Sequence, residues 1–282
     1  MNFFEQLGGE LRKLFAKPRT WMGYGAFLAM EVVILCVYKL EKSQHYMRMM
    51  VERNGLEFGT YYSSLTITFT IMLLSMFLLG SIYFALVAGD IVAKENEDGN
   101  LRMVFARPIS RLRLLLVKYA AICLYTVSFV FFVGISGYAM AVLAVGLEGG
   151  LFVMEPKMKV FAAYPEWAEG ATRLALSAAG ISISMVTLSS MAFMFSCFRI
   201  KPAAAAIVTL TILFVDMILQ SFPFFKPYES FFITWRMSAW IFFMEQHLSW
   251  PKLIESYALL FGLNASFFTI GWLAFQTRDF KT

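Results

Sequence analysis

Long apolar runs separated by short polar segments dominate the chain. A helix of about 20 apolar residues crosses the hydrocarbon layer of a bilayer, and its backbone hydrogen bonds are satisfied within the helix. The pattern therefore predicts an all-α membrane protein with one transmembrane domain over residues 1–282. Polar loops are expected at residues 39–60 and 148–171. The six predicted transmembrane helices lie at about 21–38, 62–93, 112–147, 172–198, 203–222 and 253–275.

The first twenty residues have a different pattern. Phe3, Leu7, Leu11 and Leu14 recur at helical spacing, and charged residues occupy the other face. This pattern predicts an amphipathic helix over residues 3–16 that lies in the membrane interface and ends before Pro18. The segment contains no continuous apolar core of the kind found in signal peptides, so we expect the first span to remain in the mature chain.

Composition supports a membrane location and indicates an orientation. Hydrophobic residues make up 59% of the chain and charged residues only 15%, against about 25% in ordinary soluble domains. The net charge is +5, and because Lys and Arg gather beside the spans, we attribute it to cytoplasmic flanks and anionic membrane lipid rather than to nucleic acid. Segments 1–20, 94–118, 199–201 and 278–282 hold 14 of the 24 Lys and Arg residues, which predicts that both termini are cytoplasmic.

The segment at residues 94–111 is predicted to be a cytoplasmic coupling segment. It joins two spans that are longer than a bilayer requires, so their ends are expected to form a stalk. Leu101, Val104 and Phe105 form an apolar stripe, Pro108 ends it, and Ser110 is a candidate N-cap for the third span. An apolar stripe in water needs a cover, which predicts a protein partner whose acids pair with Arg102 and Arg107. The alternative is a solvated basic loop.

Residues 94–119 read KENEDGNLRMVFARPISRLRLLLVKY, and this phrase resembles the permease subunits of ATP-binding-cassette (ABC) exporters of the ABC-2 type, also called type V exporters. The C-terminal pattern of Phe275, Arg278, Asp279 and Phe280 agrees with that resemblance. It implies that the segment is a coupling helix seated in a groove of a nucleotide-binding subunit. The resemblance and the stripe together predict an ATPase-coupling surface at Glu95, Glu97, Asp98, Gly99, Leu101, Arg102, Val104, Phe105, Arg107 and Pro108.

The sequence contains no G-x-x-x-x-G-K-[ST] phosphate loop, so ATP and magnesium are expected on a partner chain, with no cofactor and no enzymatic activity in this one. The resemblance implies that six spans build half of a translocation pathway. We therefore expect two permease copies, preferably a homodimer, with two copies of a cytoplasmic ABC ATPase. The expected location is a bacterial or archaeal plasma membrane, with multiple passes.

Two acids deep in predicted spans, Asp216 and Glu31, are candidates for the translocation pathway, because ionisable groups cost roughly 2.5–3.5 kcal/mol at the centre of a membrane helix. The alternative is that each pairs with a polar group between helices. Asp90 lies near a span end and is predicted to be structural. Asp90 and Asp216 also suggest an intramembrane aspartyl protease, which is disfavoured because their predicted depths differ.

Three further features leave alternatives open. The small residues of segment 177–184 predict close helix packing in the fourth span. Residues 223–252 are aromatic but interrupted by charges, which predicts an extracytoplasmic re-entrant or interfacial segment. The run containing His45, Met47 and Met49 suits a soft metal, although chance placement is favoured and no metal site is assigned. Rival functions are a channel, an assembly or signalling subunit, or a permease serving copper-enzyme maturation.

Overall fold

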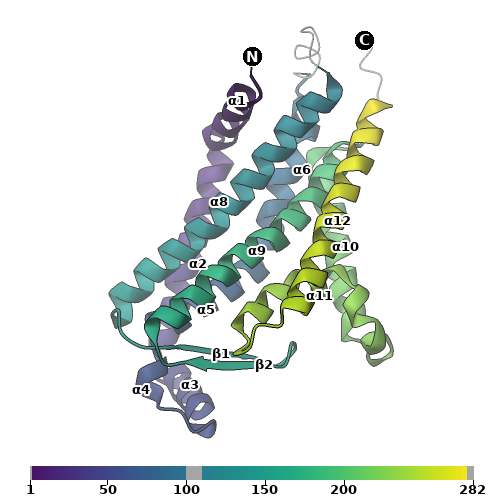
Figure 1. The fold of residues 1–282 in the computed structure, drawn as a ribbon. Coiled ribbons are helices and arrows are strands. Elements are labelled where there is room, and N and C mark those ends of the chain that lie inside the picture. The colour runs from purple at the N-terminus through teal and green to yellow at the C-terminus, as the bar shows by residue number, and fades with distance from the viewer. Residues whose placement is uncertain (1, 100–109, 278–282) are drawn as a thin grey trace.

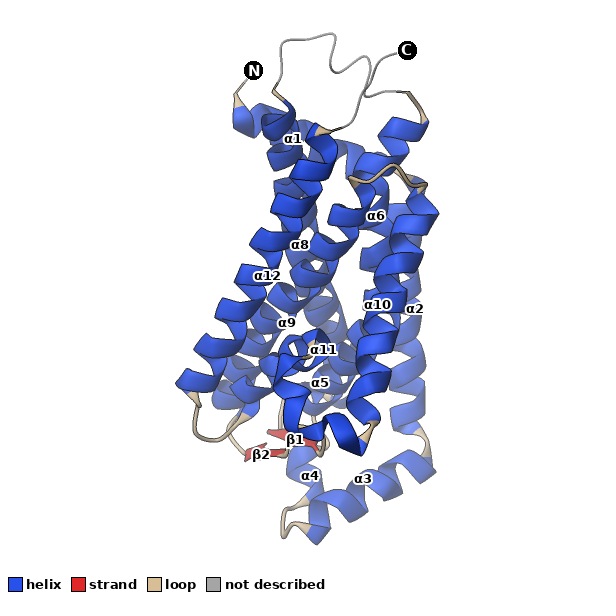
Figure 2. Ribbon diagram, turned by 90° about the vertical axis from the view of Figure 1, so that its right-hand side faces the viewer, coloured by secondary structure: helices blue, strands red, loops and turns tan. Residues whose placement is uncertain are grey.

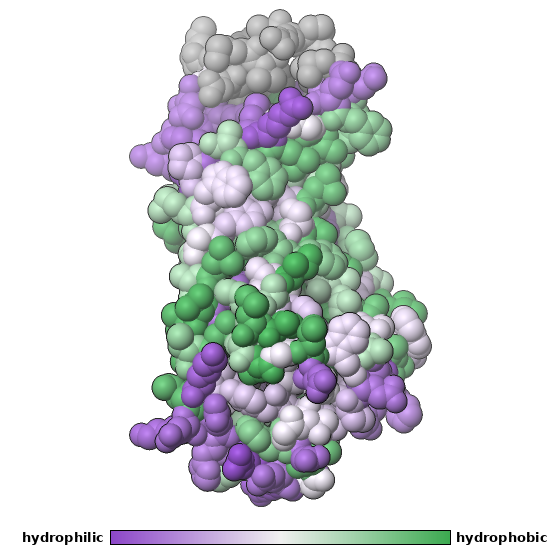
Figure 3. Space-filling view, turned by 90° about the vertical axis from the view of Figure 1, so that its left-hand side faces the viewer, coloured by the Kyte–Doolittle hydropathy of each residue, from purple (hydrophilic) through white to green (hydrophobic). Residues whose placement is uncertain are grey.

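The computed structural model describes residues 2–99 and 110–277. Within them, six helices are long and apolar enough to cross a membrane, which confirms the predicted multi-span helical fold. They run side by side along one axis (Figure 1), and a belt of hydrophobic side chains separates two polar ends (Figure 3). The spans are α2 (Pro18–Lys39), α5 to α6 (Ser64–Glu97), α8 (Arg111–Val145), α9 (Trp167–Ser196), α10 (Pro202–Ser221) and α12 (Trp250–Gln276).

The second span contains an irregular turn that the sequence pattern does not predict. It consists of α5 (Ser64–Ser75), a π-helical turn η1 (Met76–Gly80) and α6 (Ser81–Glu97). A π turn admits an extra residue and changes which face the next helix presents. The second and third spans have 34 and 35 residues, so both exceed the length that a bilayer requires.

Local signals at the start of the chain and of α8 agree with the predicted helices. The helix α1 (Phe3–Ala16) begins with a capping box between Asn2 and Glu5. It ends at Ala16, before Lys17. The next helix, α2, begins at Pro18 and not at the predicted residue 21, because proline fits the first position of a helix. Ser110 caps α8 by accepting a hydrogen bond from the backbone N–H of Arg113.

The two predicted polar loops are wrong in detail, because both fold into short elements at one end of the bundle. The first contains α3 (Glu41–Arg53) and α4 (Phe58–Tyr61). The second contains an antiparallel hairpin of β1 (Leu151–Glu155) and β2 (Val160–Tyr164), in which Leu151 is opposite Tyr164. Val51, Tyr61 and Phe152 bury their side chains together, which joins the two regions. We call this the hairpin end (Figure 2).

Residues 223–252 contain three short helices between α10 and α12. They are η2 (Pro223–Phe231), α11 (Ile233–Met237) and η3 (Ser238–Met244), of which η2 and η3 are 3-10 helices. The last of them packs against α9, where Gly180 permits the approach: a Cβ atom there would lie 2.8 Å from the Cβ of Trp240. The small-residue face of α9 therefore serves close packing.

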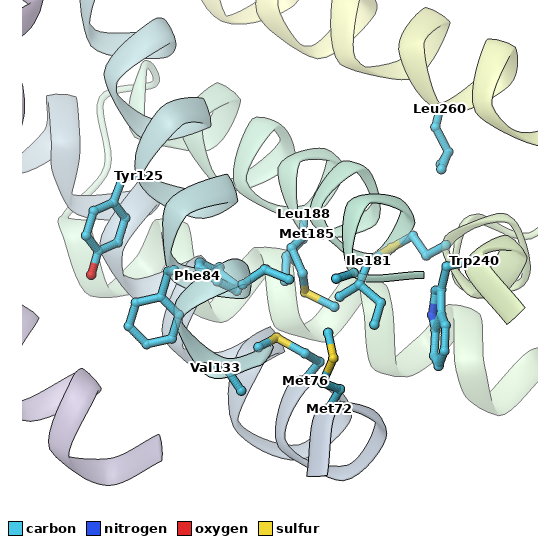
Figure 4. Packing of buried hydrophobic residues seen from close by; sticks show 14 of the residues in the cluster. Met72, Met76, Phe84, Tyr125, Val133, Ile181, Met185, Leu188, Trp240 and Leu260 are labelled. Atoms are coloured by element: carbon cyan, nitrogen blue, oxygen red, sulfur yellow. The ribbon is translucent and has the colours of Figure 1, made fainter. Parts of the chain in front are cut away.

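The helix α9 lies at the centre of the fold and contacts α6, α8, α10 and α12. Its side chains Ile181, Met185 and Leu188 meet Met72 and Met76 of the second span (Figure 4). The outer helices are covered on one side only, so α2, α10 and α12 present apolar side chains to the surroundings. That distribution fits a bundle whose solvent is lipid.

Candidate functional site at the terminal end of the bundle

The start of α1, the end of α6, the start of α8 and the end of α12 gather at the end of the bundle opposite the hairpin (Figures 1 and 2). We call this the terminal end. A network of four charged side chains joins three of these helices there. The network consists of Glu10 and Lys13 from α1, Glu95 from α6 and Lys118 from α8.

Lys118 is the centre of this ion-pair network, and its side chain is fully buried. Its Nζ donates to Glu10 Oε2 at 2.8 Å and lies 2.8 Å from Glu95 Oε2. Lys13, at the surface, donates to the other oxygens, at 2.6 Å to Glu10 Oε1 and 3.3 Å to Glu95 Oε1. Two cations therefore face two carboxylates, and the buried charge is compensated.

The local sequence explains why these groups converge. Glu10 lies one helical turn before Leu14, and both residues are on the buried face of α1. Lys118 lies two turns into α8 among apolar neighbours, so its ammonium must find partners between the helices. The pairing fixes α1 against the stalk formed by α6 and α8.

The network also shifts the proton affinities of the groups on α1. Burial alone would raise the pKa of Glu10, but the charge and hydrogen bond of Lys118, aided by Lys13, hold that pKa below its usual value. Burial alone would lower the pKa of Lys13, but its contacts with Glu10 and Glu95 raise it. The pKa of Lys17 is lowered by burial and by the nearby cations Arg19 and Lys118.

Other basic residues at this end are also engaged within the chain. Arg19 pairs with Asp90, which gives Asp90 the structural role that its position near a span end predicts. Arg113 donates to Gln6 at 3.0 Å, and Arg111 donates to the carbonyl of Gln276 at 2.7 Å. The first turn of α8 is therefore fixed to α1 and to the end of α12.

The structure describes part of the predicted coupling surface. Glu95 points into the ion-pair network, whereas Glu97 and Asp98 pair with Lys94 at the exposed end of α6. Gly99 has a φ of +73°, the left-handed conformation that commonly ends a helix. The remaining predicted residues lie outside the described parts of the chain: Leu101, Arg102, Val104, Phe105, Arg107 and Pro108.

Asp216 acts as a long-range cap in the structure. Its carboxylate accepts hydrogen bonds from the backbone N–H groups of Ile233 at 3.2 Å and Thr234 at 2.8 Å, and from the Thr234 hydroxyl at 2.5 Å. These are the first N–H groups of α11, which the α11 sequence itself does not cap. The structure therefore brings Asp216 to a backbone partner, the alternative to its predicted role in the pathway.

Glu31, the second pathway candidate, is fully buried between α2 and α8. Its Oε1 accepts a hydrogen bond from Ser136 at 2.8 Å, and its Oε2 has no hydrogen-bond partner among the described residues. Asp216 and Glu31 thus occupy separate environments. Asp90 and Asp216 are likewise held by different partners, unlike the paired carboxylates of an aspartyl protease.

The described residues hold no group of three or more His, Cys, Asp and Glu side chains that could bind a metal. In the methionine-rich run, Met47 is buried against Val51 while Met49 is half exposed, so the two thioethers face different surroundings. Glu10, Lys13 and Lys118 are not among the site residues that the sequence pattern predicts. The available signals were a lysine inside an apolar run and a glutamate on the apolar face of an amphipathic helix.

The fold and the terminal end define a multi-pass helical membrane protein in which the start of α1, the end of α6, the start of α8 and the end of α12 lie at one end of the bundle. A family model described as ABC-2 family transporter protein matches residues 7–216, well over half of the chain. The chain therefore belongs to the ABC-2 transporter family and is a permease subunit of an ABC transporter. This membership implies association with a cytoplasmic ATPase subunit. No curated protein sequence matches the chain.

Proposed function

We propose that this permease subunit forms half of the translocation pathway of an ATP-driven exporter. It would work as a homodimer with two separate ATPase subunits, which bind ATP and magnesium. The terminal end would face the cytoplasm of a bacterial or archaeal cell, in agreement with the distribution of Lys and Arg along the chain. Two six-span copies would supply the paired bundles that the family resemblance implies.

The observation that supports coupling most strongly is the ion-pair network beside the predicted coupling segment. The predicted segment begins in the last turn of α6, which ends at Glu97, and reaches α8 at Arg111; both spans exceed the length that a bilayer requires. Glu95 and Lys118 join the two helices just inside those points at 2.8 Å, and Glu10 ties α1 to the same lysine. A force on the segment would therefore act on α1, α6 and α8 together.

This arrangement suggests how ATP binding would move the membrane helices. Closure of the ATPase pair would tilt the segment and the stalk. Because η1 interrupts the second span, α6 can change its angle relative to α5 without breaking a regular helix. The closely packed α6 and α10 would follow, since Gly89 allows the two backbones to approach: a Cβ there would lie 3.2 Å from the backbone nitrogen of Ala206. The pathway would thus alternate between inward-facing and outward-facing or collapsed states.

The test is the paired substitution Leu101→Asp and Phe105→Asp, which places two charges on the predicted stripe. We expect the permease to insert normally but to lose at least tenfold in the yield of co-purified ATPase and in substrate-stimulated ATP hydrolysis. Met103→Asp is the matched control, because residue 103 lies on the opposite side of the predicted helix. Normal complex yield and normal hydrolysis in the paired variant would refute the coupling role.

A further inference from the structure

A cleft opens beside the ion-pair network, between α2, α6 and the start of α10. Its volume is about 610 Å³, and it is lined by cationic side chains at the terminal end and by apolar side chains further along the helices. The three helices lie next to one another, with α6 in contact with both neighbours (Figure 2). The proposed coupling mechanism does not use this cleft.

The charged part of the cleft contains more cations than anions. Arg19, Lys94 and Lys201 line it, together with the carboxylates Asp90 and Glu97. Arg19 pairs with Asp90, and Lys94 pairs with Glu97. Lys201, in contrast, forms no ion pair with any residue in ranges 2–99 and 110–277. An anion entering the cleft would therefore meet one uncompensated ammonium and the half-exposed guanidinium of Arg19.

The apolar part of the cleft is lined by exposed side chains of two membrane-spanning helices. Met22 and Leu86 line it and are 73% and 42% exposed. The same side of α10 continues with the exposed side chain of Ile207, one turn beyond the cleft residue Ala203. A ligand that fills the whole cleft would need an anionic head and an apolar tail. A soluble anion would leave the apolar wall uncovered.

We propose that this cleft binds the phosphate-bearing headgroup of an anionic membrane lipid, with Lys201 and Arg19 at the phosphate and Met22 and Leu86 along the acyl chain. Lysine and arginine at a membrane boundary attract such headgroups through their positive charge. Asp90 and Glu97 keep the site from being a general anion trap, so the lipid tail contributes part of the affinity.

Occupancy of the cleft would bear on α6. Asp90 and Lys94 in the cleft and Glu95 in the ion-pair network belong to the same two turns of that helix. A bound lipid would brace α2 and α10 against those turns and hold the stalk in one position. The binding itself requires no ATPase, so it can be tested apart from the proposed coupling.

The experiment measures binding of dioctanoyl phosphatidylglycerol to the purified, delipidated full-length permease in detergent, by native mass spectrometry and by the shift in melting temperature. The variant is Lys201→Glu, and the matched control is Lys157→Glu in the β-hairpin turn, which makes the same charge change at the opposite end. Lys201 is exposed, and its side chain makes no capping hydrogen bond to α10, so its substitution leaves the fold intact. Inorganic phosphate and dioctanoylglycerol are the two comparison ligands.

We expect the lipid to bind the parent chain and Lys157→Glu equally, and to bind Lys201→Glu at least tenfold more weakly. We expect neither inorganic phosphate nor dioctanoylglycerol, at the same concentration, to stabilise the permease. Equal lipid binding by Lys201→Glu would overturn the site. Equal stabilisation by inorganic phosphate would make the ligand a soluble anion, and equal stabilisation by dioctanoylglycerol would show that the phosphate is not recognised; either result would overturn the proposal.

Discussion

Replacing Lys118 by methionine removes the centre of the ion-pair network while keeping an unbranched side chain of similar length. The substitution leaves Glu10 and Glu95 close together, with Lys13 at the surface as their remaining cation. The buried carboxylate of Glu10 and the partly buried carboxylate of Glu95 then share one exposed ammonium. We expect this change to destabilise the terminal end more than any exposed charge substitution.

The magnitude follows from the geometry. Each 2.8 Å contact of Lys118 is worth roughly 6 kcal/mol of Coulomb energy at an effective dielectric constant of about 20, before desolvation is subtracted. Burial of the three charges offsets much of that energy, and removal of one partner from a buried ion pair typically costs about 3–5 kcal/mol. We expect a loss near the lower limit, because Lys13 still pairs with both carboxylates.

The free energy of unfolding can be measured by titration with SDS in mixed micelles, with circular dichroism as the signal. Arg48→Met is the control, since Arg48 and Glu52 are both more than half exposed at 3.9 Å and their pairing is worth less than about 1 kcal/mol. Adding Glu95→Gln to Lys118→Met should restore most of the stability, because it removes the excess negative charge. Equal stability of Lys118→Met and Arg48→Met, or additive losses in the double variant, would refute the reasoning.

Three further predictions concern single carboxylates. The pKa of Glu10 is lowered in the folded chain, so the contribution of Glu10 to stability is complete above its ordinary pKa of about 4.5 and is lost as the pH falls through the lower pKa of the folded chain. As the pH falls from 6 to 3, the melting temperature should therefore decrease more steeply for the parent chain than for Glu10→Gln. Asp216→Ala should cost roughly 1–2 kcal/mol, the usual value of a helix cap, and increase hydrogen exchange at Ile233 and Thr234, whereas unchanged exchange would contradict the capping role. Glu31→Gln should retain the Ser136 hydrogen bond and raise or preserve the free energy of unfolding, because a neutral amide is less costly to bury; a loss above about 1 kcal/mol would show that the carboxylate is required.

Much of the fold could be predicted from the sequence, because each span is an apolar run whose length matches a membrane. Caps such as Ser110 and breaks such as Pro18 placed the helix boundaries within a few residues. The elements at the hairpin end were missed for a physical reason. β1 and β2 have five residues each, and the hairpin is held by distant groups: the N–H of Gly150 donates to the carbonyl of Thr60 at 2.8 Å.

The candidate site was predicted less completely. Three basic residues that follow Pro108, namely Arg111, Arg113 and Lys118, contact other parts of the chain, and the sequence pattern predicts none of these contacts. Glu10 and Lys118 are 108 positions apart, and no local pattern links residues so distant. Likewise, the cap that Asp216 provides depends on the path of the chain from α10 to α11, which hydrophobicity alone does not determine.

The central claim is that this permease works with a separate ATPase, and affinity purification from the native host tests it most directly. The tagged full-length chain is solubilised in detergent, and the co-purified proteins are identified and quantified by mass spectrometry. The account predicts a soluble protein with a phosphate-binding loop in equal amount to the permease. Recovery of the chain alone, or with partners that bind no ATP, would contradict it.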